Sequence, residues 1–173
     1  MTQILFIGDS LIAEYDWQSR LNMHSVQNFG IPGLVTQDLY DMLSGIHEQS
    51  HSPDVVVVMI GTNDILSDNY RFIHTLKKTI IQLRQDFPSA EILLTSLLPM
   101  KIPDLPDTTI PSINTHLEAL TMQTGCCYLD IYTKFCESEE TIFQADGVHI
   151  TKAAYEIWRR MLLEHIAFLI END

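Results

Sequence analysis

Residues 54–64 have the sequence DVVVVMIGTND and contain the longest uninterrupted apolar run of the chain, Val55 to Ile60. Consecutive apolar residues, most of them β-branched, predict a strand buried on both faces, as in a parallel sheet covered by helices. The glycine and polar residues that follow mark the carboxyl end of this strand. Because ligands of such sheets bind beyond the carboxyl ends of the strands, functional residues are expected there.

Similar apolar runs elsewhere in the chain predict the remaining strands. The strands predicted in this way are residues 3–7, 26–29, 54–60, 91–96 and 127–131. Between and after them lie helical stripes: Leu39, Leu43 and Ile46; Phe72, Leu76, Ile80 and Leu83, ending near Phe87-Pro88; and Ala154, Ile157, Trp158, Met161, Leu162 and Ile166, with Thr151 as N-cap. This alternation predicts an α/β fold with a parallel sheet, right-handed crossovers and helices on both faces.

Size and charge restrict the class of protein. A chain of 173 residues fits a single domain over residues 1–173. Its 23 acidic against 10 basic residues give a net charge of −13, which disfavours nucleic acid as a partner. The longest apolar run is far shorter than the roughly 20 residues that a membrane-spanning helix needs.

The N-terminus and the cysteines bear on the compartment. The first apolar stretch, residues 4–7, lacks a preceding basic region and is too short for a signal-peptide core. Three cysteines, Cys126, Cys127 and Cys136, indicate neither a disulfide framework nor a zinc site. We therefore expect a cytoplasmic protein with reduced cysteines; a secreted chain that has lost its leader is the alternative.

Residues that can carry chemistry follow the first three predicted strands. Ser10 follows the first strand through Gly8 and Asp9 and opens a helix, whose free N–H groups suit a nucleophile that generates an oxyanion. Gly30 follows the second strand, where a backbone N–H can approach a ligand closely. Asn63 follows the third strand and offers a side-chain amide to developing negative charge. Taken singly, each of these residues is equally compatible with an ordinary cap or turn.

A further candidate pair lies just before the last predicted helix. Asp146 and His149 are three residues apart in Asp146-Gly147-Val148-His149, so the carboxylate can accept a hydrogen bond from the imidazole in a turn. Such a bond fixes the tautomer and leaves the other ring nitrogen free to take a proton from Ser10. A metal-ligand pair or a capping arrangement has the same spacing.

Four segments in this order resemble the GDSL/SGNH hydrolase family. They are residues 6–11 (FIGDSL, block I), 28–33 (NFGIPG, block II), 61–64 (GTND, block III) and 146–149 (DGVH, block V). The resemblance implies a flavodoxin-like three-layer α/β/α fold with a central sheet of about five parallel strands. It also implies a serine esterase without a cofactor, in which Ser10, Asp146 and His149 form the catalytic triad and Ser10, Gly30 and Asn63 form the oxyanion hole. The expected substrate is a small acyl ester (a carboxylester, a lysophospholipid or a thioester), because a chain of this size leaves little material for a lid or an extended cleft.

Two other functions remain open from the residues alone. A metal-dependent hydrolase would use Asp9, Asp64, Asp146 and His149 as ligands. A non-catalytic binding domain would retain the motifs and the fold without the activity. No sequence feature assigns substrate-binding residues or an oligomeric state.

Several other residues are expected to have structural roles. Asp9 and Asp64 are expected to hold their loops through backbone hydrogen bonds, and Trp158 is a predicted core residue; Trp17 either packs on the sheet or lines a pocket. The remaining histidines are predicted at the surface or its boundary: His24, His47, His51, His74, His116 and His165. The irregular stretch 99–111 is expected to overhang the same end of the sheet as Ser10 and to offer its Met, Ile and Leu side chains as an acyl-binding wall.

Overall fold

The structure, a computed structural model, describes residues 1–171 and consists of alternating strands and helices. In chain order they are β1 (Gln3–Gly8), α1 (Ser10–Ala13), α2 (Trp17–Arg20), β2 (Ser25–Gly30), α3 (Thr36–Gln49), β3 (Val55–Met59), α4 (Thr62–Leu66), α5 (Phe72–Asp86), β4 (Glu91–Thr95), α6 (Thr109–Thr124), β5 (Cys127–Leu129), α7 (Ile131–Cys136) and α8 (Lys152–Glu171). Each predicted strand has a counterpart among them.

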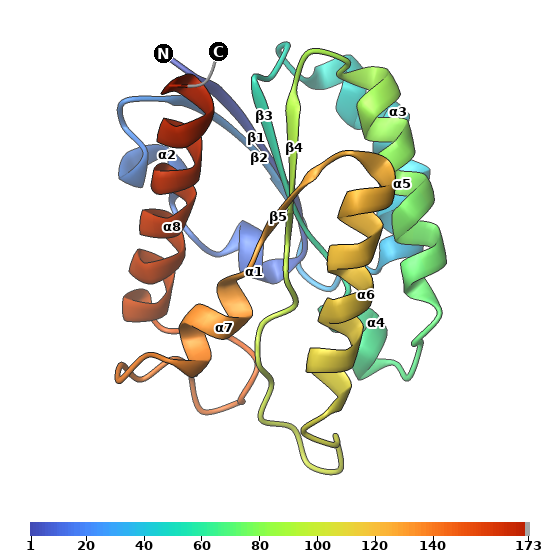
Figure 1. Cartoon of the computed structure of the whole chain (residues 1–173), viewed down its shortest axis with the longest axis vertical. Coiled ribbons are helices and arrows are strands. Elements are labelled where there is room, and N and C mark those ends of the chain that lie inside the picture. The colour runs from blue at the N-terminus through green and yellow to red at the C-terminus, as the bar shows by residue number, and fades with distance from the viewer. Residues whose placement is uncertain (172–173) are drawn as a thin grey trace.

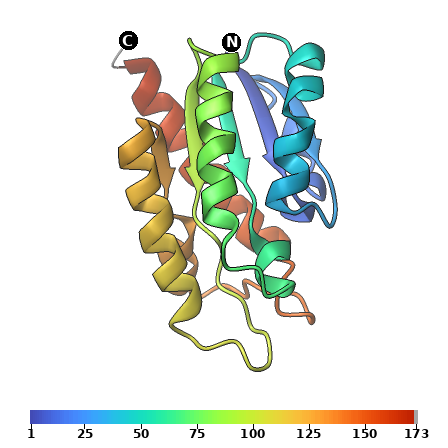
Figure 2. The ribbon, with the colours of Figure 1, turned by 90° about the vertical axis from the view of Figure 1, so that its right-hand side faces the viewer.

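The strands form one parallel sheet in the order β2-β1-β3-β4-β5. Helices α3, α5 and α6 cover one face, while α2 and α8 cover the other (Figures 1 and 2). This is the three-layer, flavodoxin-like α/β/α arrangement, so the predicted fold class is confirmed. From β1 the chain crosses to β2 on one side and then to β3 on the other, so the strand order reverses between β1 and β3. A ligand is expected in the crevice at this topological switch point, beyond the carboxyl ends of these two strands.

The core lies on both sides of the central strands. Every residue of β3 is buried, as the uninterrupted valine run predicts. On the α8 face, the fully buried Trp17 stacks on Phe6 of β1, with ring centroids 4.4 Å apart, and its Nε1 donates to the Ile12 carbonyl. Trp158 meets Trp17 edge-on and is likewise buried, as expected for a core residue. Trp17 therefore packs on the sheet.

Two predicted boundaries differ from the structure by more than one residue. The last strand ends at Leu129, because the Asp130 side chain accepts a hydrogen bond from the Thr133 N–H and caps α7, which includes Ile131. The predicted irregular stretch 99–111 ends at Thr108, because α6 begins at Thr109.

The loop between β4 and α6 reaches the segment that carries His149. Lys101 N–H donates to the Gly147 carbonyl at 2.9 Å, so the loop does overhang the predicted end of the sheet. Met100 and Leu105, however, pack against the core and are only partly exposed. They are therefore tied into the fold, and an acyl-binding role for this loop stays a prediction.

The remaining histidines and the cysteines lie where surface or boundary residues are expected. His47, His51, His74 and His116 are exposed, and His24 and His165 are half-buried. Cys126 and Cys127 are half-buried, Cys136 is exposed, and all three are free. Among residues 1–171 no helix is both long enough and apolar enough to span a bilayer.

Candidate active site

Ser10 lies at the carboxyl end of β1, as the first residue of α1. Asp9 caps this helix: its Oδ1 accepts a hydrogen bond from the Leu11 N–H at 3.0 Å. Because Asp9 provides the cap, the Ser10 hydroxyl is not needed for it. Gly8 is required at the turn, because a Cβ there would lie 2.1 Å from the Met59 carbonyl oxygen of the neighbouring strand.

Ser10, His149 and Asp146 form a continuous hydrogen-bonded chain. Ser10 Oγ lies 3.1 Å from His149 Nε2, although the two residues are 139 positions apart. His149 Nδ1 lies 2.5 Å from Asp146 Oδ2. Asp146 Oδ1 also accepts the N–H groups of Val148 and His149, which fixes the turn between the two side chains.

The pKa values of this pair are displaced in opposite directions. The hydrogen bond to His149, together with the backbone N–H groups, lowers the pKa of Asp146 to about 2. The hydrogen bond to Asp146 raises the pKa of His149, and the nearby Glu14 carboxylate adds to the rise against partial burial. The pair therefore favours an ionised aspartate and a histidine that holds a proton readily.

Asn63 lies on the opposite side of the switch point, in α4 after β3. Its Nδ2 donates one hydrogen to the Leu34 carbonyl at 3.0 Å. A side-chain amide has two N–H donors, so one remains for a ligand. The chain enters α4 through Gly61, whose φ of 121° and close contact with Phe72 exclude a larger residue.

Gly30 does not present the free N–H that the sequence led us to expect. Its N–H donates to the Asn28 side chain at 2.8 Å, and Asn28 is anchored by the Ile12 carbonyl. The prediction that Gly30 contributes to an oxyanion hole therefore requires Asn28 to release this donor. The loop after β2 offers an alternative in Gly33, which is exposed, has φ +80° and donates its N–H to no acceptor within residues 1–171. Gly33 precedes Leu34, whose carbonyl binds Asn63.

Asp9 and Asp64 hold the surrounding loops, as expected. Asp64 is buried; its Oδ2 accepts from both the N–H and the hydroxyl of Thr36, and its Oδ1 accepts from Asn69. Asp9 is also fully buried, its Oδ2 has no hydrogen-bond partner among residues 1–171, and burial raises its pKa to about 7. In the described part of the chain, no three His, Cys, Asp or Glu side chains gather as ligands for a metal ion. The four residues of the metal-dependent alternative thus do not form a common ligand set.

The family of this chain follows from a comparison with protein-family models. The model of the GDSL-like lipase/acylhydrolase family matches residues 6–157, which include Ser10, Asn63 and the 146–149 segment. The chain belongs to this family. Membership makes it an esterase-type serine hydrolase, and it confirms the resemblance inferred from the four sequence blocks. Comparison with proteins of curated function gives no significant match.

Solved structures of the same fold include several lipolytic proteins and esterases. A candidate platelet activating factor from Streptococcus pneumoniae is 25% identical, with a TM-score of 0.83 over 94% of this chain and 82% of that one. A G-D-S-L family lipolytic protein from Veillonella parvula is 22% identical, with a TM-score of 0.80 over 95% and 97% of the two chains. An acetylxylan esterase from Geobacillus stearothermophilus is 21% identical, with a TM-score of 0.79 over 95% and 94%. The last two likenesses establish the fold alone.

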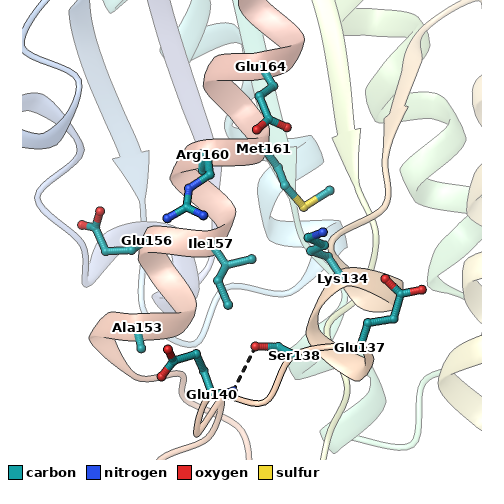
Figure 3. Close-up of a pocket in the computed structure, with 10 residues that line it drawn as sticks. All are labelled: Lys134, Glu137, Ser138, Glu140, Ala153, Glu156, Ile157, Arg160, Met161 and Glu164. Atoms are coloured by element: carbon teal, nitrogen blue, oxygen red, sulfur yellow. Dashed lines mark hydrogen bonds between the residues drawn. The ribbon is translucent and has the colours of Figure 1, made fainter.

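The surroundings of the GDSL-family site are open. The side chains of His149 and Asp146 are 30% and 50% exposed. A pocket of about 510 Å³ adjoins the histidine side of the site and is lined by Glu14, Tyr15, Asp16, Arg20, Gln144, Ile150, Lys152, Ala153, Tyr155 and Glu156. A separate cavity of about 580 Å³ lies between α7 and α8 and does not include Ser10 (Figure 3). Glu156 borders both cavities but points away from the other side chains drawn in Figure 3.

Glu14 is a site residue that the sequence analysis missed. Its Oε1 lies 3.6 Å from His149 Nε2, the nitrogen that faces Ser10. Glu14 follows Ser10 by four positions, and its N–H donates to the Ser10 carbonyl, so one helical turn places both side chains on the same side. This spacing was the available signal, but without the position of His149 it does not distinguish Glu14 from a solvated surface acid.

Proposed function

We propose that this hydrolase cleaves small acyl esters through an acyl-serine intermediate, with Ser10 as nucleophile, His149 as general base and then general acid, and Asp146 as the residue that orients the histidine. The hydrogen-bonded chain from Ser10 Oγ through the imidazole to Asp146 carries this proposal. Nucleophile, base and orienting carboxylate in mutual contact are the signature of an activated serine.

The reaction proceeds in two acyl transfers. His149 Nε2 takes the hydroxyl proton as Ser10 Oγ bonds to the ester carbonyl carbon, and the carbonyl oxygen gains the negative charge. Collapse of this intermediate breaks the bond to the leaving-group oxygen or sulfur, which receives the proton from Nε2. Water then repeats the sequence on the acyl-serine and releases a carboxylic acid and free Ser10.

The oxyanion would be held by donors on the switch-point side of Ser10. We assign this role to three donors: the Ser10 N–H, the Asn63 Nδ2 hydrogen that does not bind the Leu34 carbonyl, and a backbone N–H of the loop after β2. Within that loop the Gly33 N–H has no competing acceptor among residues 1–171, whereas Gly30 would first have to lose its bond to Asn28.

We also propose that residues 1–173 act as one domain. Two observations support this: a single core extends from β1 to α8, and the family match covers residues 6–157.

Substitution of Asn63 by Ala is expected to lower kcat by a factor of about 10² to 10³, because the transition state loses one preorganised donor. KM should change much less, since the ground-state carbonyl carries little charge. Steady-state kinetics on p-nitrophenyl acetate measure both quantities. Asn69→Ala, which removes an amide that binds Asp64 and not the substrate, is the matched control; equal losses in both variants would contradict the oxyanion role.

The activity is expected to fall as the pH decreases through the raised pKa of His149. Only the neutral imidazole accepts the Ser10 proton, so kcat/KM is fully developed above that pKa and is lost below it. Because Asp146 raises the pKa of His149, the acidic limb should lie above the pH of about 6.5 expected for an unperturbed histidine. A pH profile of kcat/KM measures the limb, and a midpoint below 6 would contradict the proposed pairing.

The proposed function is tested by ester hydrolysis with and without a chelator. We expect the purified protein to hydrolyse p-nitrophenyl acetate at the same rate before and after incubation with EDTA. Activity that is lost with EDTA and restored by a divalent metal would favour the metal-dependent alternative. A folded protein that hydrolyses no acyl ester would favour the non-catalytic alternative.

A further inference from the structure

The side of the site from which the leaving group departs has an acidic character. The leaving-group atom receives its proton from His149 Nε2, so its substituents must pass close to that nitrogen. Glu14 Oε1 lies 3.6 Å from Nε2 and belongs to no other ion pair within residues 1–171. A substrate bound to Ser10 therefore places the first atoms beyond its leaving-group oxygen or sulfur near this carboxylate.

The charges that act on His149 have the same sign. The groups with the largest electrostatic effect on the imidazole are the carboxylates of Asp146, Glu14 and Asp9. Asp146 is engaged at Nδ1, and Asp9 is fully buried. Glu14 is 47% exposed and is thus the carboxylate of this set that a leaving group can approach at Nε2.

The pocket beside His149 also contains carboxylates farther from the reacting atoms. Its lining includes three carboxylates and two cations. The Arg20 guanidinium lies 3.7 Å from Glu156, which is also held by Arg159 and by the Tyr15 hydroxyl. Lys152 is the cation of this lining without an ion pair among the described residues, but no contact brings it to His149. The charge nearest the leaving group is therefore that of Glu14.

We propose that Glu14 is a specificity-determining residue that selects esters with a cationic leaving group over neutral ones, and neutral ones over anionic ones. This inference rests on the proposed function. The Glu14 carboxylate attracts a positive charge two or three bonds beyond the scissile atom and repels a negative one. An exposed carboxylate has a modest effect on each charge, so we expect a factor of about fivefold for each step of charge. Added salt should reduce the selectivity by screening.

Three thioesters with the same acyl group test this selectivity. Acetylthiocholine carries a quaternary ammonium group, 3,3-dimethylbutyl thioacetate is its neutral isostere, and S-acetyl-2-mercaptoethanesulfonate carries a sulfonate. The measured quantity is kcat/KM for release of the thiol, at a pH where His149 is neutral. Ratios between substrates cancel any effect that is common to all three, including a changed pKa of His149.

The wild type is expected to rank the substrates cationic, neutral, anionic, with a total spread of about 25-fold at low salt and a smaller spread at 0.5 M NaCl. Glu14→Gln should reduce the spread to about twofold. Glu139→Gln removes the same charge from an exposed loop position and should preserve the wild-type ratios. Equal rates for the three substrates in the wild type, or the same ratios in Glu14→Gln as in the wild type, would overturn the role of Glu14 while hydrolysis itself upheld the proposed function. Hydrolysis of none of the three would overturn the proposed function, and the selectivity with it.

Discussion

Replacement of Ser10 by Ala is expected to lower kcat by about a millionfold while the protein remains folded. A triad acts as a unit, so loss of its nucleophile leaves only binding and oxyanion stabilisation. The helix cap at this position is Asp9, and the Ser10 hydroxyl contacts His149 rather than the core. Stability should therefore change little. Steady-state hydrolysis of p-nitrophenyl acetate and thermal unfolding measure the two effects.

A serine on the solvent face of α3 provides the matched control for this variant. Ser44 is exposed, and Ser44→Ala removes the same hydroxyl far from the sheet end that carries Ser10. It should retain wild-type kcat. Ser10→Ala with more than about one hundredth of the wild-type kcat would contradict the nucleophile assignment.

Replacement of Asp146 by Asn is expected to lower kcat by about 10⁴-fold. The amide keeps the shape of the carboxylate, and its oxygen can still accept the N–H groups of Val148 and His149 that hold the turn. It cannot stabilise the imidazolium, and it favours the wrong tautomer of His149. The acidic limb of the pH profile should also move to lower pH, because the main cause of the raised pKa of His149 is removed.

The control for this variant is another aspartate that accepts backbone hydrogen bonds in a turn. Asp130 caps α7 in this way, so Asp130→Asn tests the effect of the same change on loop structure alone. It should leave kcat and the pH profile unchanged. A loss of less than tenfold in Asp146→Asn, or an unmoved acidic limb, would contradict the proposed orientation of His149.

The fold could be predicted from the sequence because its signals are local. Consecutive buried valines in β3 and the apolar stripes of α3, α5 and α8 each require only neighbours along the chain. One of the errors arose where a side chain at a boundary decides the outcome. Asp130 ends the last strand by capping α7, and apolarity alone had extended that strand to Ile131.

The site was less predictable, because its contacts join segments that are far apart in the chain. The positions of the four sequence blocks predicted that Ser10, His149 and Asp146 lie together, and in the structure these three side chains are in contact through His149. The residue type does not determine where a backbone N–H points, so the bond between the Gly30 N–H and the Asn28 side chain could not be predicted from the sequence. Glu14 was indistinguishable from a surface acid until His149 was placed beside it.

Covalent labelling with a fluorophosphonate probe, followed by measurement of the intact mass, tests whether Ser10 is an activated nucleophile. The probe reports the nucleophile without assuming a substrate. We predict one adduct per chain on the wild type and none on Ser10→Ala. A folded wild type that remains unlabelled, or an adduct of equal yield on Ser10→Ala, would contradict the assignment of Ser10 as the nucleophile.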